Sequence, residues 1–126
     1  MTTKKNILLV SVISTALLAG CSAEQATVSF QTDVKPLFGK YCTECHVPGG
    51  DGTAQSGFVI ETYASIMKGT KYGPVVVAGD PLSSSLYRLV AGKVDPSIQM
   101  PHGKAAMAPE EITTIEQWIE QGAKDN

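Results

Sequence analysis

The 126-residue sequence has only three cysteines, no excess of positive charge and no long apolar run. Three cysteines cannot form the several disulfides of a small secreted scaffold. Ten Lys and Arg against 12 Asp and Glu give a net charge of -2. No basic excess is available to neutralise a phosphate backbone, so we expect no nucleic-acid partner. The longest apolar run starts at Ile7 and stops at Gly20, which is too short for a membrane-spanning helix of roughly 20 apolar residues.

The remaining composition is that of one globular domain, with 43% hydrophobic and 17% charged residues.

Residues 1–20 predict an export signal. Lys4 and Lys5 provide its positive start, and residues 7–18 are its apolar stretch. Ala19 and Gly20 are the small residues that a cleavage site requires.

Cys21 directly follows this signal, and the string Leu18-Ala19-Gly20-Cys21 resembles the bacterial lipoprotein signal. In that family the chain is cut before the cysteine, which then carries the lipid. We therefore expect a signal peptide over residues 1–20, a polar tether over 21–29 and one domain over 30–126. The protein would be exported and lipid-anchored to a bacterial membrane, facing the periplasm. An ordinary secretory signal and an uncut signal anchor are the alternatives.

The string Cys42-Thr43-Glu44-Cys45-His46 has the Cys-x-x-Cys-His spacing of a c-type haem attachment site. Two thiols on one helical turn can each bond a vinyl group of one porphyrin, and His46 can then ligate the iron. Since no second such motif is present, we expect one covalent haem c. A thioredoxin-like redox pair, half of a zinc site and a simple disulfide also use Cys-x-x-Cys. No βαβ pattern and no second ligand pair supports the first two.

The iron of a haem electron carrier usually takes a second axial ligand, commonly methionine. The sequence offers Met67, Met100, Met107 and His102. Met67 has the helical spacing of a core residue and Met107 precedes the last predicted helix, so we expect packing roles for both. Met100 lies in a loop beside Pro101, which restricts the backbone, and is the predicted sixth ligand. His102 is the alternative.

Apolar spacing predicts a mainly α fold. The first helix is expected over residues 33–41 with Thr32 as its cap, and the haem motif completes it. Residues 47–57 are rich in glycine and are predicted to form a loop over the haem edge. Further helices are expected at residues 61–68, at 83–91, and from Pro109 to the residue before Gly122.

Between Val34 and Ala123 the sequence resembles the planctomycete-type cytochrome c domain, a monohaem c-type cytochrome. Besides the haem motif it shares an aliphatic-Lys-Pro lead-in, a Gly-Asp-Pro segment, a Met-Pro pair and a closing Glu-Ile…Trp-Ile…Gly-Ala helix. These features are Val34-Lys35-Pro36, Gly79-Asp80-Pro81, Met100-Pro101, and Glu111-Ile112 with Trp118-Ile119 and Gly122-Ala123.

The resemblance implies a small helical domain wrapped around one covalent haem, with the first and last helices crossing beside it, and electron transfer as its role. Two departures from the family pattern matter. His102 stands where a second proline usually follows Met-Pro, which brings a rival ligand near the iron. The Gly-Pro pair that many small cytochromes c use to orient the ligating histidine is absent, so the sequence identifies no acceptor for the His46 ring N–H.

The leading hypothesis is therefore an exported, lipid-anchored electron carrier, not an enzyme, with His46 and Met100 as iron ligands. It requires a redox partner protein that the sequence does not name. The alternative is a haem-based gas sensor or peroxidase-like enzyme, in which Met100 is labile and His102 and Lys104 are acid–base groups. A third hypothesis is a structural lipoprotein with a disulfide between the two motif cysteines.

Overall fold

The computed structural model describes residues 25–126, so the predicted signal peptide and Cys21 lie outside the described residues. This part of the chain forms five α-helices, a π-helical turn (η1) and a 3₁₀ turn (η2). In chain order they are η1 Phe30–Val34, α1 Lys35–Tyr41, α2 Asp51–Ser56, α3 Tyr63–Lys68, α4 Ser85–Val90, η2 Pro96–Ile98 and α5 Pro109–Glu120. No strand occurs over residues 25–126, and the predicted mainly α fold is confirmed.

The first helical stretch begins earlier than the sequence predicted. The prediction that Thr32 caps this helix was wrong, because the Ser29 hydroxyl accepts the Thr32 backbone N–H at 3.3 Å. The chain enters through η1, in which the N–H of Val34 donates to the Ser29 carbonyl five residues back. The change from π to α register falls at Lys35 and Pro36, where proline has no N–H to continue the ladder.

Residues 47–57 contain helix α2, so the prediction of a loop over this whole segment was wrong. Two of the glycines that suggested a loop stand at the ends of the helix. Gly50 is its N-cap, and Gly57 ends it in the left-handed conformation with φ 75°, which glycine adopts without strain. Only Gly52 lies inside the helix, where it has a separate role at the candidate site.

The other predicted helices are present with small shifts at their ends. Helix α3 is capped by Thr62, whose hydroxyl accepts the Ser65 N–H at 3.0 Å, and it ends at Gly69. Helix α4 starts at Ser85, within the range expected. Helix α5 has Pro109 at its first position, as the sequence predicted.

The core is centred on Trp118 of α5. The rings of Phe30 and Phe38 lie 5.5 and 6.4 Å from the Trp118 ring, centroid to centroid, and all three side chains are buried. Burial of one such side chain contributes about 1.5–3 kcal/mol. The first and last helical segments of the described chain therefore pack together through these rings.

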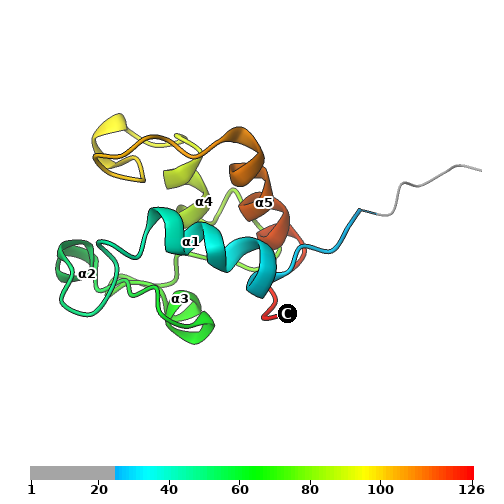
Figure 1. Ribbon diagram of the computed structural model, residues 1–126, viewed down its shortest axis with the longest axis horizontal. Coiled ribbons are helices and arrows are strands. Elements are labelled where there is room, and N and C mark those ends of the chain that lie inside the picture. The colour runs from blue at the N-terminus through cyan, green and yellow to red at the C-terminus, as the bar shows by residue number, and fades with distance from the viewer. Residues whose placement is uncertain (1–24) are drawn as a thin grey trace, which may run out of the picture.

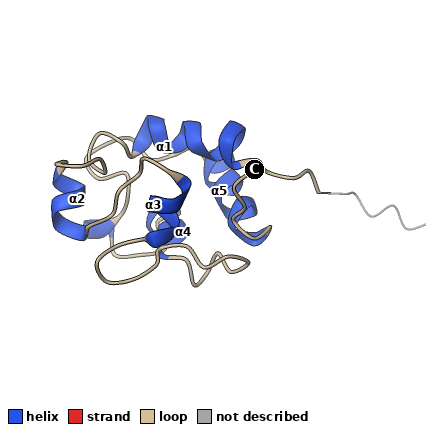
Figure 2. Cartoon of the chain, turned by 90° about the horizontal axis from the view of Figure 1, so that it is seen from below, coloured by secondary structure: helices blue, strands red, loops and turns tan. Residues whose placement is uncertain are grey.

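Figure 1 shows how the elements are distributed along the longest axis of the molecule. Helix α1 runs through the middle, α5 lies toward one end and α2 forms the other end. The N-terminal segment enters beside the C-terminus, at the α5 end. Figure 2, seen from below, gives the same order. Because the haem motif starts where α1 stops, it lies toward the end of the molecule that is away from both described termini.

Candidate haem-binding site

The haem motif forms a turn that continues directly from α1. The Cys42 N–H donates to the Phe38 carbonyl at 2.9 Å, and the N–H groups of Cys45 and His46 both donate to the Cys42 carbonyl, at 3.2 and 3.0 Å. Cys42, Cys45 and His46, all predicted site residues, are thereby gathered on one turn. The Cys42 side chain is half-buried, the Cys45 side chain is exposed, and both thiols are free.

The two thiols differ in their surroundings. Burial raises the pKa of the Cys42 thiol to about 11, although the Lys104 ammonium opposes this shift. Cys42 packs against the hydrophobic core, which is the source of this burial. No group of three or more His, Cys, Asp and Glu side chains that could hold a metal ion occurs among residues 25–126.

The His46 ring has a hydrogen-bond partner that the sequence did not reveal. Its Nδ1 lies 3.3 Å from the backbone carbonyl oxygen of Phe58. A carbonyl oxygen only accepts, so the bond requires the proton on Nδ1 and leaves the Nε2 lone pair for a metal. The Phe58 ring also contacts the imidazole edge-on, with centroids 5.4 Å apart. Any residue can supply a backbone carbonyl, so no residue type marks it in the sequence.

Two glycines let the backbone of α2 approach the motif closely. A Cβ on Gly52 would lie 2.8 Å from His46 Cε1, and a Cβ on Gly50 would lie 2.4 Å from the Cys45 carbonyl oxygen. Both separations are shorter than side-chain contacts allow. The glycines that suggested a loop therefore form a cradle against the imidazole and the motif backbone.

The loop that carries Met100 is tied to α4. The Met100 N–H donates to the Leu89 carbonyl at 3.1 Å, and the half-buried Met100 side chain packs against the core. His102 is exposed. Met100, His102 and Lys104 contribute to the lining of a cavity of about 290 Å³ on this loop.

An ion pair joins this loop to the haem motif. The Lys104 ammonium pairs with the carboxylate of Glu44, one of the two residues between the motif cysteines. The pair lowers the pKa of Glu44, chiefly through its hydrogen bond with Lys104, and raises the pKa of Lys104. The structure thus brings the predicted attachment residues and the segment of the predicted sixth ligand to one region.

Residues 42–102 match the model of the family described as planctomycete cytochrome C. This match confirms the predicted resemblance. The matched segment runs from Cys42, the first motif cysteine, to His102 and includes the Met100-Pro101 pair. No curated protein and no solved structure matches the chain.

The residues of the candidate site fit a haem c. Two thiols on one turn suit the two thioether bonds of the cofactor, and the imidazole is oriented by the Phe58 backbone carbonyl, as is usual for a ligating histidine. The close approach of Gly50 and Gly52 holds the turn and the ring from the side of α2. The family match supports a haem-dependent role in electron transfer.

A polar cluster that the sequence analysis missed lies beside the motif. The Glu111 carboxylate of α5 accepts the Tyr41 O–H at 2.6 Å, the Lys40 ammonium at 2.8 Å and the Ala108 N–H at 2.9 Å. The Lys40 and Tyr41 bonds lower the pKa of Glu111 to about 2. The cluster joins the last turn of α1 to the start of α5, next to Cys42.

The other two candidate methionines have the packing roles that were predicted. Met107 is buried in the core, and the half-buried Met67 packs against it.

Proposed function

We propose that this protein is a monohaem c-type cytochrome that carries single electrons outside the cytoplasm. The observation that carries the proposal is the turn on which Cys42, Cys45 and His46 lie together, with His46 Nδ1 bound to the Phe58 carbonyl. Cys42 and Cys45 would hold the haem covalently, and His46 Nε2 would be its proximal ligand. The haem iron supplies the one-electron chemistry.

Met100 is the proposed sixth ligand. Its half-buried side chain and the bond from its N–H to α4 give it a fixed place on its loop. His102, two residues later, is exposed. A thioether favours ferrous iron and raises the potential, which suits an electron carrier.

The cavity beside Met100 favours a second candidate function. Its volume of about 290 Å³ and its lining by His102 and Lys104 would admit a small ligand if Met100 left the iron. The protein would then be a haem-based gas sensor or a peroxidase-like enzyme. In the electron carrier, His102 and Lys104 are surface residues, and Lys104 serves as the partner of Glu44.

The proposed location is the periplasmic side of a bacterial membrane, with lipid on Cys21 as the anchor. Among residues 25–126 no helix is long and apolar enough to span a membrane. Lipid chains provide firm attachment when more than one is present. A redox partner protein, with no nucleic acid involved, completes the proposal.

A visible spectrum of the purified protein tests the function. A low-spin, six-coordinate spectrum is expected, and the haem stain should survive denaturing electrophoresis. A five-coordinate spectrum would favour the sensor or enzyme. A protein without haem, or a stain lost on acid-acetone extraction, would overturn the cytochrome proposal.

A further inference from the structure

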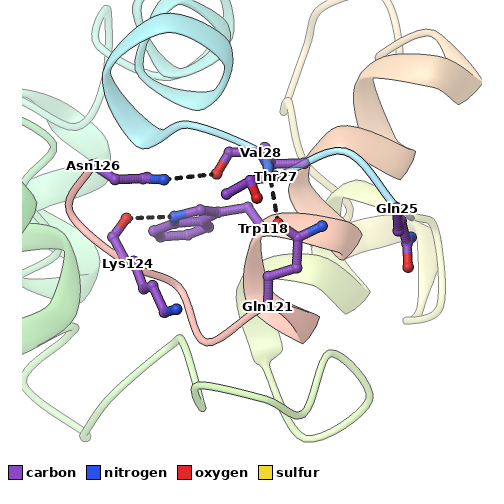
Figure 3. Close-up of a pocket in the computed structure, with 7 residues that line it drawn as sticks. All are labelled: Gln25, Thr27, Val28, Trp118, Gln121, Lys124 and Asn126. Carbon is purple, nitrogen blue, oxygen red and sulfur yellow. Dashed lines mark hydrogen bonds between the residues drawn. The ribbon is translucent and has the colours of Figure 1, made fainter.

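The segment that precedes η1 is bound to the C-terminal end of the domain (Figure 3). The Gln121 side chain accepts the Val28 N–H at 2.8 Å and donates to the Ala26 carbonyl at 3.1 Å. The Asn126 side chain accepts the Phe30 N–H at 2.8 Å and donates to the Val28 carbonyl at 3.3 Å. We call residues 26–29 the strap, because Gln121 and Asn126 hold its backbone on both sides.

The strap changes the expected length of the tether. The sequence predicted a tether over residues 21–29, but residues 26–29 are fixed to the domain by these bonds. Along the sequence, only residues 22–25 then separate Cys21 from the strap. Four extended residues reach at most about 14 Å, whereas a folded chain of this size is on the order of 30 Å across.

The strap and the haem motif lie at different ends of the molecule, as Figures 1 and 2 show. They are connected by the continuous helical stretch of η1 and α1, which runs from Phe30 to Tyr41. Twelve residues at the helical rise of 1.5 Å correspond to about 18 Å. A short anchor at the strap therefore holds one end of the domain at the lipid surface and leaves the motif end further out.

The net charge of the domain also opposes broad contact with the lipid surface. Without Lys4 and Lys5 the chain has 8 positive and 12 negative side chains, a net charge of -4. Anionic lipids repel such a domain, so it has no general electrostatic reason to lie flat on the bilayer.

We propose that the face formed by the strap and residues 124–126 is the membrane-facing surface of the domain, and that the haem edge faces the aqueous phase. The redox partner then approaches from the side away from the lipid. This inference rests on the proposed lipid anchor and adds the orientation that the anchor imposes.

The test uses the lipidated, haem-loaded protein in nanodiscs that contain a gadolinium-bearing headgroup lipid. Backbone amide signals are recorded in the reduced, diamagnetic state. The signals of residues 26–29 and 124–126 should be lost by broadening, whereas those of α2 should be retained. Equal broadening of α2 and the strap would overturn the proposed orientation.

Two test variants and one control separate the strap from other causes. The double variant Gln121→Ala, Asn126→Ala should release the strap. It should therefore reduce the difference in signal broadening between the strap and α2, which is called the contrast below. Glu120→Ala, an exposed change one residue from Gln121, should leave the contrast intact. A twelve-residue Gly-Ser insertion between Ser22 and Ala23 lengthens the tether without touching the strap and should also remove the contrast. A contrast that survives both the double variant and the insertion would overturn the inference.

Flotation with vesicles and the visible spectrum distinguish this inference from the proposed function. A parent protein that does not float contradicts the lipid anchor, and one without a haem spectrum contradicts the cytochrome. If the protein floats and contains haem, but the amide signals of α2 broaden as much as those of the strap, the result contradicts the orientation alone.

Discussion

At the scale of single residues, the sixth ligand decides the redox character of the protein. Thioether sulfur favours ferrous iron and raises the potential, whereas a second imidazole favours ferric iron and lowers it. Met100 and His102 stand two residues apart on one loop, but Met100 packs against the core and His102 is exposed.

Met100→Ala should therefore abolish the weak near-infrared sulfur-to-iron band of the oxidised protein and lower its potential. His102→Ala is the matched control, and it should keep the band and shift the potential only slightly. A parent protein that lacks the band, together with a spectrum that changes on His102→Ala, would show bis-histidine ligation and contradict the proposal.

A second residue-scale prediction concerns Gly52. An added Cβ would overlap the His46 imidazole at 2.8 Å, so Gly52→Ala should displace the ring from the Phe58 carbonyl. Overpacking of this kind costs about 1–3 kcal/mol of stability, and loss of the bond between the His46 ring and the Phe58 carbonyl should change the potential.

Gly39→Ala is the control for this substitution. Gly39 lies inside α1, and an added Cβ there would meet nothing within 4 Å. It should stabilise the protein by about 0.4–1 kcal/mol and leave the spectrum unchanged. Denaturant unfolding and redox titration of both variants measure the two effects. Equal behaviour of the two variants would show that the contact with His46 has no consequence.

At the scale of elements, the Glu111 cluster fixes α5 against the end of α1. Its Lys40 and Tyr41 partners belong to the turn that leads into Cys42, and its Ala108 partner ends the loop that carries Met100. One carboxylate therefore connects the three segments that surround the candidate site.

The lowered pKa of Glu111 makes this connection sensitive to acid. A carboxyl group whose pKa is lower in the folded than in the unfolded state stabilises the fold above its ordinary pKa. That stabilisation should be lost as the pH falls from about 5 toward about 2, the pKa of folded Glu111. Glu111→Gln should therefore destabilise the protein at pH 7 and weaken this part of its acid dependence. Glu110→Gln, on the exposed neighbour in the same helical turn, is the control and should destabilise the protein less at pH 7. Unfolding at a series of pH values measures both variants.

At the scale of the whole molecule, the haem should supply much of the core. The described chain has short helices and long connections, and a small domain of this kind buries a modest apolar area. A covalently bound macrocycle adds apolar surface and a cross-link.

The double variant Cys42→Ala, Cys45→Ala should consequently be largely unfolded by circular dichroism. Cys21→Ala is the control, because it should keep the haem and the fold while the protein leaves the membrane or the precursor stays uncut. A folded double variant would show that the polypeptide core is sufficient without the cofactor. A Cys21→Ala variant that fractionates and migrates like the parent would contradict the lipid anchor.

The sequence by itself determined the features that depend on neighbouring residues. The attachment motif, the mainly α fold and the start of α5 at Pro109 follow from spacing, helix periodicity and the fixed φ of proline. The family was identified by the resemblance of several short motifs, which also lie within the sequence itself. The packing of Met67 and Met107 was predicted for the same reason.

Only the tertiary structure decided which distant groups meet. The acceptor for the His46 ring N–H is a backbone carbonyl, which cannot be predicted from residue type. The glycines of residues 47–57 were interpreted by composition as a loop, but their role depends on the imidazole packed against them. Ser29 takes the capping place predicted for Thr32 because the chain enters α1 through a π turn. Gln121 and Asn126 hold a strap that looked like free tether, because their partners lie more than ninety residues away.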